Sequence, residues 1–202
     1  MESKCYDGDV AVVSTFEFHK DRERAPHWEQ PIHRGRLETA ARFVLDARVL
    51  DAVEKTTVVD LGCGDGGLVA HLRLNWSRTL DVSGYDFQPS NEDGWKERRL
   101  EGVCHQLDFV RWWTAVPRAE VYVITEVLEH LTDPHTMLKR IRMRGAQLVC
   151  SSPHDETHES HDACHAWAWD QEGYAAMIRE AGFAIRAHEI VDRFQVVWAV
   201  PE

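Results

Sequence analysis

The sequence predicts an α/β fold: a single doubly wound sheet of about seven strands, mostly parallel, with one antiparallel strand near the C-terminus and helices on both faces. Three observations predict it. Short β-branched runs alternate with stretches of helical spacing from about residue 35 onward, a pattern typical of a parallel sheet. Two final strand-like runs are joined by a tight turn, so one of them runs in reverse. The length of 202 residues suits one domain.

The first half of the chain divides into a polar segment and the start of the domain. Residues 1–30 hold no clear periodicity, so we treat them as an N-terminal segment that is either a lid or disordered, and 31–202 as the domain. Apolar residues recur at helical spacing from Gly35 to about Leu50. The elements expected next are a strand at 57–61, a helix at 68–76, and strands at 80–85, 102–107 and 121–125.

The second half continues the alternation. A helix begins after Thr132-Asp133-Pro134, where a capping residue precedes a proline. A fifth strand is expected at 147–151. Asp170 caps another helix, which Gly182 closes. The last two strands, 184–191 and 194–200, flank a turn near Asp192 and are expected to be antiparallel.

Composition excludes several classes of protein. The formal net charge of −11 counts against broad affinity for nucleic acid, which needs a basic face. No apolar run approaches the roughly 20 residues of a membrane helix, and no signal-peptide core is present, so we expect a cytoplasmic protein with no membrane partner. Five scattered cysteines without a C-x-x-C pair fit buried thiols in a reducing compartment. The oligomeric state is not indicated.

The strongest motif is V-V-D-L-G-C-G-D-G-G at residues 58–67, a buried strand that runs into a glycine-rich turn and then a helix. Such a turn lets the backbone approach a ligand closely and aims a helix N-terminus at negative charge. Gly62, Gly64 and Gly67 also spell the dinucleotide fingerprint G-x-G-x-x-G. Asp60 argues against a nicotinamide enzyme, because its acid ends the strand close to where a pyrophosphate would sit.

D-L-G-C-G-D-G resembles motif I of class I S-adenosylmethionine-dependent methyltransferases, which have a Rossmann-like domain, and the resemblance extends from about Pro31 to the C-terminus. It implies S-adenosylmethionine as the cofactor. The implied cofactor-binding residues are Asp60, Gly62, Cys63, Gly64, Asp65 and Gly66 for the methionine part, Asp86 with Phe87 at the ribose, and Asp108 with Phe109 at the adenine.

A second motif, E-V-L-E-H-L, follows the fourth expected strand. If a helical turn starts there, Glu126, Glu129 and His130 lie at i, i+3 and i+4 and share one face. Two carboxylates and an imidazole are a plausible Mg²⁺ or Mn²⁺ site. The same letters are widespread in class I methyltransferases that use no metal, where the motif lines the cofactor pocket and Glu126 would lie near the transferred methyl. Both interpretations stay open.

A histidine-rich loop at residues 152–165 follows the fifth strand at the same edge of the sheet. Its histidines bind a metal, serve as a general base, or only titrate in a solvated acidic loop. His165 before Ala166-Trp167-Ala168-Trp169 resembles small-RNA 3′-terminal 2′-O-methyltransferases, in which the matching residues Glu126, Glu129, His130 and His165 would bind Mg²⁺ or Mn²⁺. The acidic charge departs from that family, and so does His154, which replaces its usual asparagine.

We therefore expect methyl transfer from S-adenosylmethionine to an O or N nucleophile of a small-molecule acceptor, with Glu126, His130 and His165 as candidate catalytic residues. The alternatives are a metal-dependent methyltransferase of RNA 3′ ends, a non-catalytic S-adenosylmethionine-binding subunit, and a nicotinamide oxidoreductase. Tryptophans at 112, 113, 167 and 169 either stack on the acceptor or pack on the edges of the sheet.

Overall fold

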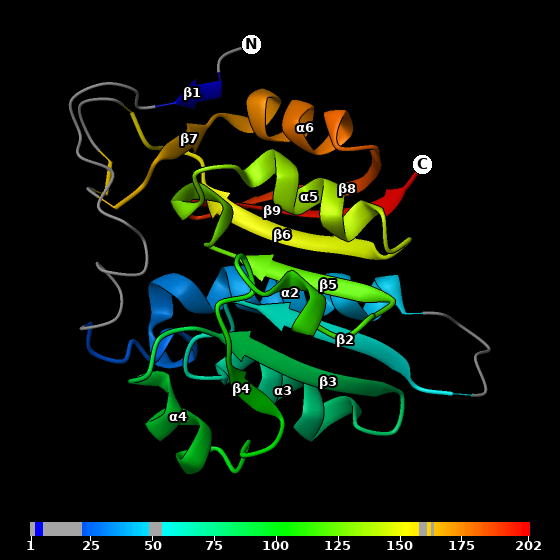
Figure 1. Cartoon of the computed structure of the whole chain (residues 1–202). Coiled ribbons are helices and arrows are strands. Elements are labelled where there is room, and N and C mark those ends of the chain that lie inside the picture. The colour runs from blue at the N-terminus through cyan, green and yellow to red at the C-terminus, as the bar shows by residue number, and fades with distance from the viewer. Residues whose placement is uncertain (1–2, 6–21, 49–53, 158–160, 163) are drawn as a thin grey trace.

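The protein is built around one seven-stranded sheet (Figure 1). The computed structural model describes residues 3–5, 22–48, 54–157, 161–162 and 164–202. In spatial order the strands are β4 (Cys104–Gln106), β3 (Leu80–Asp86), β2 (Thr56–Leu61), β5 (Val121–Thr125), β6 (Gln147–Pro153), β9 (Phe194–Pro201) and β8 (Phe183–Val191). β9 pairs antiparallel with both β6 and β8, whereas the other neighbours are parallel. The predicted sheet with one reversed strand is confirmed.

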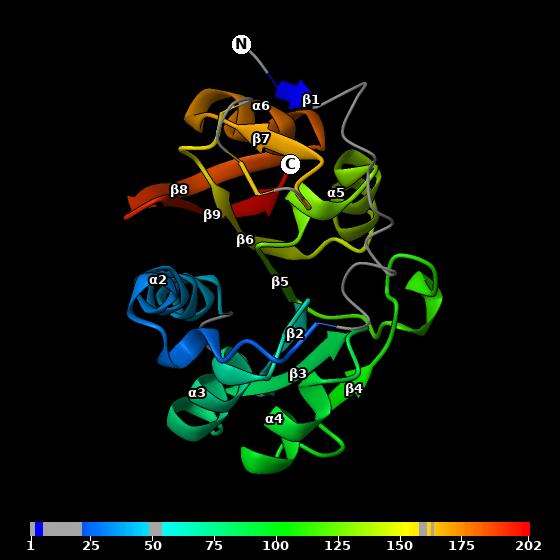
Figure 2. The same ribbon diagram turned by 90° about the vertical axis from the view of Figure 1, so that its left-hand side faces the viewer.

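Helices cover both faces of this sheet, as predicted. They are α2 (Pro31–Ala47), α3 (Gly67–Trp76), α4 (Asn91–Glu97), α5 (Pro134–Arg142) and α6 (Gln171–Glu180), with 3-10 turns η1 (His27–Glu29), η2 (Trp113–Ala115) and η3 (Leu128–His130). Figure 2 shows α2 and α3 on the opposite side of the sheet from α5. Side chains of β5 alternate accordingly: Val121 and Val123 join the core under α2 and α3, and Tyr122 and Ile124 join the core under α5 and α6.

Three features of the fold differ from the sequence-based expectation. α2 begins at Pro31, four residues before the predicted start, because a proline suits the first helical position; positions 49 and 50 of the predicted helix lie outside the described residues. The strand predicted at 102–107 is shortened to β4, since Gly102 has φ +76° and belongs to the preceding turn. α4 was not predicted, because its polar sequence carries no apolar periodicity.

A short two-stranded sheet was also missed. β1 (Ser3–Cys5) pairs antiparallel with β7 (Trp167–Trp169), beside the main sheet. Three-residue strands are too short for period-two patterning to reveal them. None of the helices in the described part of the chain is long and apolar enough to cross a membrane.

Candidate functional site

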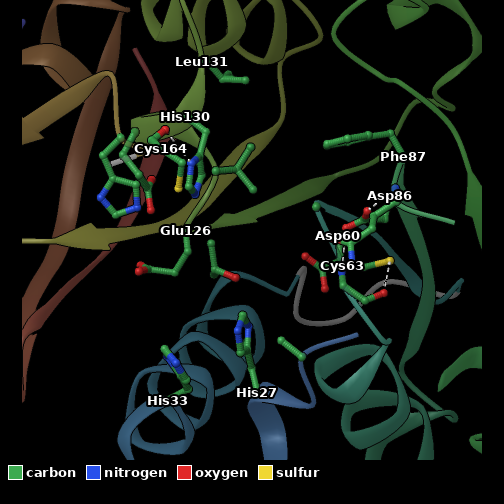
Figure 3. Close-up of a pocket in the computed structure, with 18 of the residues that line it drawn as sticks. His27, His33, Asp60, Cys63, Asp86, Phe87, Glu126, His130, Leu131 and Cys164 are labelled. Carbon is green, nitrogen blue, oxygen red and sulfur yellow. Dashed lines mark hydrogen bonds between the residues drawn. The ribbon is translucent and has the colours of Figure 1, made fainter. Parts of the chain in front are cut away.

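A pocket of about 1170 Å³ lies at the carboxyl ends of the central strands. Asp60 near the end of β2, Asp86 at the end of β3 and Glu126 directly after β5 all line it. Figure 3 shows Asp60 and Asp86 on one side, and Glu126 and His130 on the other. Open α/β sheets bind ligands at this edge, so the fold and the pocket place the site together.

The glycine loop after β2 forms one wall of the pocket, and its geometry requires glycine. Gly62 has φ +77°, and a Cβ there would lie 2.3 Å from Cγ2 of Val127. Gly66 has φ +81° and a Cβ would meet Leu100 at 2.6 Å. Gly66 is the N-cap of α3 but does not line the pocket, so its predicted contact with the cofactor is not supported.

Asp60 is a buried acid with one carboxylate oxygen that is unpaired among the described residues. It is 2% exposed, and its Oδ1 has no hydrogen-bond partner within the described structure. Burial, and then the nearby charge of Asp86, raise the pKa of Asp60 to about 7. Leaving a buried carboxylate oxygen unpaired is costly. An ammonium group such as that of S-adenosylmethionine would supply the missing donor, so the residue fits the implied cofactor.

Asp86 is held rigidly beside the loop. Its Oδ2 accepts the N–H of Gly64 at 2.9 Å, and its Oδ1 accepts the N–H of Gln88 at 2.8 Å. Burial raises the pKa of Asp86, and these backbone hydrogen bonds oppose the shift. Each carboxylate oxygen can accept a second hydrogen bond. The Asn91 side chain and the Phe87 N–H also donate to this carboxylate, so a ribose hydroxyl would share its oxygens with these donors.

The other predicted cofactor residues line the pocket, but not all of them are available to contact a cofactor. Cys63, Asp65, Phe87, Asp108 and Phe109 all line the pocket. Asp65, however, is already engaged: its carboxylate pairs with Arg98 at 2.8 Å and lies 3.4 Å from Arg24. It thus fixes the N-terminal segment and the end of α4 around the loop. Phe109 is also part of the hydrophobic core under α5.

The segment after β5 does not form the predicted helical turn. Glu126 has φ +55°, a left-handed conformation that ends the strand and prevents helix, and the following turn is the 3-10 helix η3. The N–H of Glu126 donates to the carbonyl of Ser151, and the Oε1 of Glu126 accepts a hydrogen bond from Ser151 Oγ at 2.9 Å. A non-glycine residue in this region stores about 1–3 kcal/mol of strain. The neighbouring strand β6 therefore fixes the Glu126 carboxylate inside the pocket.

Glu129 is a second, fully buried acid. Its exposure is 0%, and within the described structure neither carboxylate oxygen has a hydrogen-bond partner. Burial, and then the charge of Glu126, raise the pKa of Glu129 well above its ordinary value. Burial therefore favours the protonated form of Glu129 over the charged form.

His130 and His165 meet on the far side of the pocket. Their rings lie 4.6 Å apart, and with Cys164 they offer ligand atoms that all lie within 4.8 Å of one another. The four predicted metal ligands are thus brought together only in part, because Glu126 and Glu129 are not in this cluster. The helical spacing that grouped them fails where Glu126 leaves the helical conformation.

Sequence reasoning did not propose Arg36 as a site residue, although it is a buried arginine that lines the pocket. It is 2% exposed, and its Nε and Nη1 have no hydrogen-bond partner in the described part of the chain. Glu126, Glu129 and Asp60 face it, and burial lowers its pKa. The signal was present: Arg36 lies four residues before Ala40 and so shares the apolar stripe of α2.

Two histidines of the N-terminal region face the same pocket and were also missed. Burial, and then the charge of Arg36, lower the pKa of His27 to about 3 and that of His33 to about 4. Figure 3 shows both rings pointing toward the pocket from below Glu126. They therefore add neutral imidazole groups to the pocket wall, His27 from the N-terminal segment and His33 from the first turn of α2.

The four tryptophans considered as an aromatic lid do not line the pocket. Trp169 is buried and stacks on Trp167, whereas Trp113 packs beside Tyr122 under the guanidinium of Arg144. Trp112 is 54% exposed and lies beside Arg111, so packing accounts for Trp113, Trp167 and Trp169 only.

Comparisons of sequence point to one family. Residues 32–189 match a family described as a methyltransferase domain. A trans-aconitate 2-methyltransferase of Mycobacterium sp. (strain KMS) is 32% identical over 157 residues, covering 76% of this chain and 58% of that protein. A protein of the same name from Rhodococcus jostii (strain RHA1) is 29% identical, covering 78% of this chain and 67% of that protein. The chain thus spans little more than half the length of the first of these relatives.

Solved structures agree on the fold. Magnesium protoporphyrin IX methyltransferase from Synechocystis PCC 6803 with bound S-adenosylmethionine has a TM-score of 0.65 at 15% identity, covering 96% of this chain and 98% of that one. The [4+2]-cyclase SpnF has a TM-score of 0.64 at 12% identity, covering 94% and 91%. At such identities the likeness shows the fold alone. The family match extends over most of the domain, and with the fold it shows that the chain belongs to the class I S-adenosylmethionine-dependent methyltransferases.

Proposed function

We propose that the chain transfers a methyl group from S-adenosylmethionine to an oxygen of a small-molecule acceptor, and that this acceptor is a carboxylic acid. When bound, S-adenosylmethionine supplies the methyl group on a positively charged sulfur. The two relatives described above carry the name of an enzyme that acts on trans-aconitate, a carboxylic acid. The chain's own support is a set of five arginines that line the pocket: Arg22, Arg36, Arg111, Arg140 and Arg193.

Arg36 is the observation that carries the proposal. A buried guanidinium that lacks hydrogen-bond acceptors costs several kcal/mol. Its acidic neighbours Asp60, Glu126 and Glu129 all have raised pKa values, because burial favours their protonated forms. They therefore offset the charge of Arg36 only in part. A carboxylate in the pocket would supply both the missing charge and the missing acceptors, in the bidentate geometry that guanidinium favours.

The cofactor would occupy the opposite wall of the pocket. We assign Asp60, Gly62, Cys63 and Gly64 to its methionine part, Asp86 and Phe87 to its ribose, and Asp108 and Phe109 to its adenine. Asp65 is assigned to holding the loop. The unpaired Oδ1 of Asp60 and the rigid carboxylate of Asp86 support this arrangement.

A carboxylate acceptor changes what the candidate catalytic residues must do. Its oxygen is already ionised at neutral pH, so methyl transfer requires no general base. The chain's task is then to align the oxygen with the methyl group and to exclude water. On this proposal Glu126, His130 and His165 position the acceptor, and only a hydroxyl acceptor would need one of them to remove a proton.

Transfer of radiolabelled methyl to trans-aconitate and other small carboxylic acids tests the proposal, with their amides as controls. We expect methyl esters from the acids only, with a rate that stays flat from pH 6 to 9 at saturating cofactor. In Arg36→Gln we expect the KM for the acid to rise roughly 10- to 100-fold, since a hydrogen bond to a charged group contributes about 1.5–3 kcal/mol. Arg78→Gln, at an exposed arginine outside the pocket, should leave the KM unchanged.

Three outcomes would contradict it. Methylation of the amides alone would exclude a carboxylate acceptor. An unchanged KM in Arg36→Gln would remove the role of that residue, and weaker binding of S-adenosylhomocysteine instead would assign Arg36 to the cofactor's own carboxylate. Cofactor binding without transfer to any acid or to RNA would favour the non-catalytic subunit.

Methylation of RNA 3′ ends is the second candidate, favoured by the contact between His130 and His165. The net charge of −11 opposes it. A short RNA with a free terminal ribose, assayed with and without Mn²⁺, separates the two candidates: Mn²⁺-dependent labelling of this RNA would favour the second.

A further inference from the structure

The side-chain cluster of His130, Cys164 and His165 has a chemistry that the predicted Mg²⁺ or Mn²⁺ site does not explain. Those hard ions take carboxylate, carbonyl and water oxygens. The cluster instead offers two imidazoles and a thiol, with ligand atoms within 4.8 Å of one another, and neither Glu126 nor Glu129 belongs to it. Thiolate and imidazole ligands are typical of zinc.

We propose that His130, Cys164 and His165 form a binding site for a zinc-class divalent ion, with its fourth position open to the pocket. All three residues line the pocket. Three protein ligands and one open position are the arrangement of zinc sites that act on a ligand, whereas structural zinc sites have four protein ligands.

The spacing suits an ion of this size. With bonds of about 2.1 Å to nitrogen and about 2.3 Å to sulfur, ligand atoms around a tetrahedral zinc lie roughly 3.4–3.6 Å apart. The present limit of 4.8 Å therefore requires side-chain movements of about 1 Å. Rotamer adjustments of one imidazole and of the Cys164 side chain can provide that.

Each side chain of the cluster has a hydrogen-bond acceptor that is not one of the proposed ligand atoms. His165 Nδ1 lies 2.7 and 2.8 Å from the two carboxylate oxygens of Glu156, whose side chain is only 5% exposed. His130 Nδ1 lies 3.2 Å from the carbonyl oxygen of Cys164. The thiol of Cys164 donates to Asp162 Oδ1 at 3.0 Å. Carboxylate and carbonyl partners on the Nδ1 atoms of metal-binding histidines are the usual second contacts of zinc sites, where they fix the tautomer and strengthen the ligand.

The backbone fixes the loop that carries two of these ligands. Ala166 donates its N–H to the carbonyl of Glu129 at 2.8 Å, which joins the loop to η3 next to His130. His165 donates its N–H to the carbonyl of Asp162. An ion at this position would face the acceptor side of the pocket, opposite Asp60 and Asp86 in Figure 3. Its use toward an acceptor oxygen rests on the proposed function, whereas binding of the ion does not.

Metal binding to the full chain, without acceptor, tests the site directly. The protein is freed of metal with a chelator and titrated with Zn²⁺ by calorimetry, and Co²⁺ is then substituted for its absorption spectrum. We expect one tight site per chain and a thiolate-to-cobalt charge-transfer band. Cys164→Ser should remove the band and weaken Zn²⁺ binding more than tenfold, and Glu156→Gln should weaken it about 10- to 100-fold, the usual effect of losing such a second contact.

The controls separate this proposal from the others. His105→Asn changes an exposed histidine on β4 and should leave Zn²⁺ binding intact. Retained binding of S-adenosylhomocysteine shows that each variant is folded, and it is independent of the metal result. Preference for Zn²⁺ over Mn²⁺ is not diagnostic by itself, because most nitrogen and sulfur sites show it.

Two results would overturn the proposal. One is the absence of a tight Zn²⁺ site, or a site unaffected by Cys164→Ser, which would leave the cluster as a hydrogen-bonded element of the loop. The other is a Mn²⁺ site that disappears in Glu129→Gln while Cys164→Ser has no effect, which would assign the metal to the carboxylates.

Discussion

Three carboxyl groups of the pocket are buried at a cost to the stability of the fold. Asp60, Glu126 and Glu129 are acids with raised pKa values, and burial is the largest cause for each. Selection for stability alone would not bury these acids, because a neutral side chain of the same shape avoids the desolvation cost of a buried carboxylate. Such perturbed groups gather where a ligand completes them, and Asp60 gives the clearest test.

Replacing Asp60 should make the protein more stable above pH 7. The pKa of Asp60 is raised from 3.8 to about 7, so between these pH values the folded chain keeps a proton that the unfolded chain releases. Stability therefore falls as the pH rises from about 4 to about 7, by up to roughly 4 kcal/mol. The Asp60→Asn variant has no titrating group at this position, so its stability should not show this decrease with pH. Urea unfolding at pH 5 and pH 8 should show the variant gaining on the wild type as the pH rises.

The exposed Asp81 on β3 provides the matched control, since Asp81→Asn should leave the pH dependence unchanged. The same Asp60→Asn protein should lose affinity for S-adenosylhomocysteine. Parallel pH profiles for Asp60→Asn and the wild type would show that Asp60 is ionised in the folded protein at pH 5.

Residue identities were predictable where a motif fixed them and unpredictable where burial did. The acids Asp60 and Asp86 were implied by the resemblance to class I methyltransferases, and both line the pocket. Arg36 was not predicted as a site residue, since arginine is seldom fully buried. Its position in the apolar stripe of α2 could have revealed it. The roles of Glu126 and His165 stay predictions.

At the scale of elements, the glycine loop and the segment after β5 are built against each other. A Cβ on Gly62 would lie 2.3 Å from Val127 Cγ2, and Val127 follows the strained Glu126. The glycine loop and the segment after β5 are therefore packed closely against each other. The absence of a side chain at Gly62 allows the glycine loop and the segment after β5 to pack this closely.

A double-mutant cycle measures this contact. Gly62→Ala should destabilise the fold by roughly 2–4 kcal/mol, because φ +77° is unfavourable for alanine and the new methyl group overlaps Val127. Adding Val127→Ala removes the overlap, so the pair should be about 1–2 kcal/mol less destabilised than the sum of the single changes. Urea unfolding of the four proteins gives the value.

Gly102 isolates the backbone contribution. It has φ +76°, and nothing lies within 4 Å of the position that its Cβ would take. Gly102→Ala should therefore lose only about 1–2 kcal/mol. Strictly additive effects at Gly62 and Val127 would contradict the packing described here.

Elements were predictable in proportion to their length and periodicity. The central strands, α3 and α6 were expected within two residues of their observed ends, and α5 begins where it was expected to. α4 and β7 were not, because α4 is a short helix of mostly polar residues and β7 has three residues. The turn after β5 was predicted as helix from i, i+4 spacing, and the positive φ of Glu126 overrode that pattern.

On the scale of the whole molecule, the pocket joins parts of the chain that are far apart in sequence. The described part of the N-terminal segment contacts the domain through the ion pair of Arg24 with Glu97 and through Trp28, which stacks on His71. Arg193 and Phe194, at the start of β9, close the opposite side. Whether residues 1–30 act as a lid stays a prediction, and most of them lie outside the described residues.

Cofactor binding is the claim on which the rest depends. Calorimetric titration of the full chain with S-adenosylhomocysteine, beside Asp86→Ala and the exposed-site control Asp81→Ala, tests it most directly. We predict one site per chain with a Kd of roughly micromolar, about −8 kcal/mol, abolished in Asp86→Ala and retained in Asp81→Ala. Absence of binding to the wild type, or equal binding to Asp86→Ala, would contradict the assignment of this pocket.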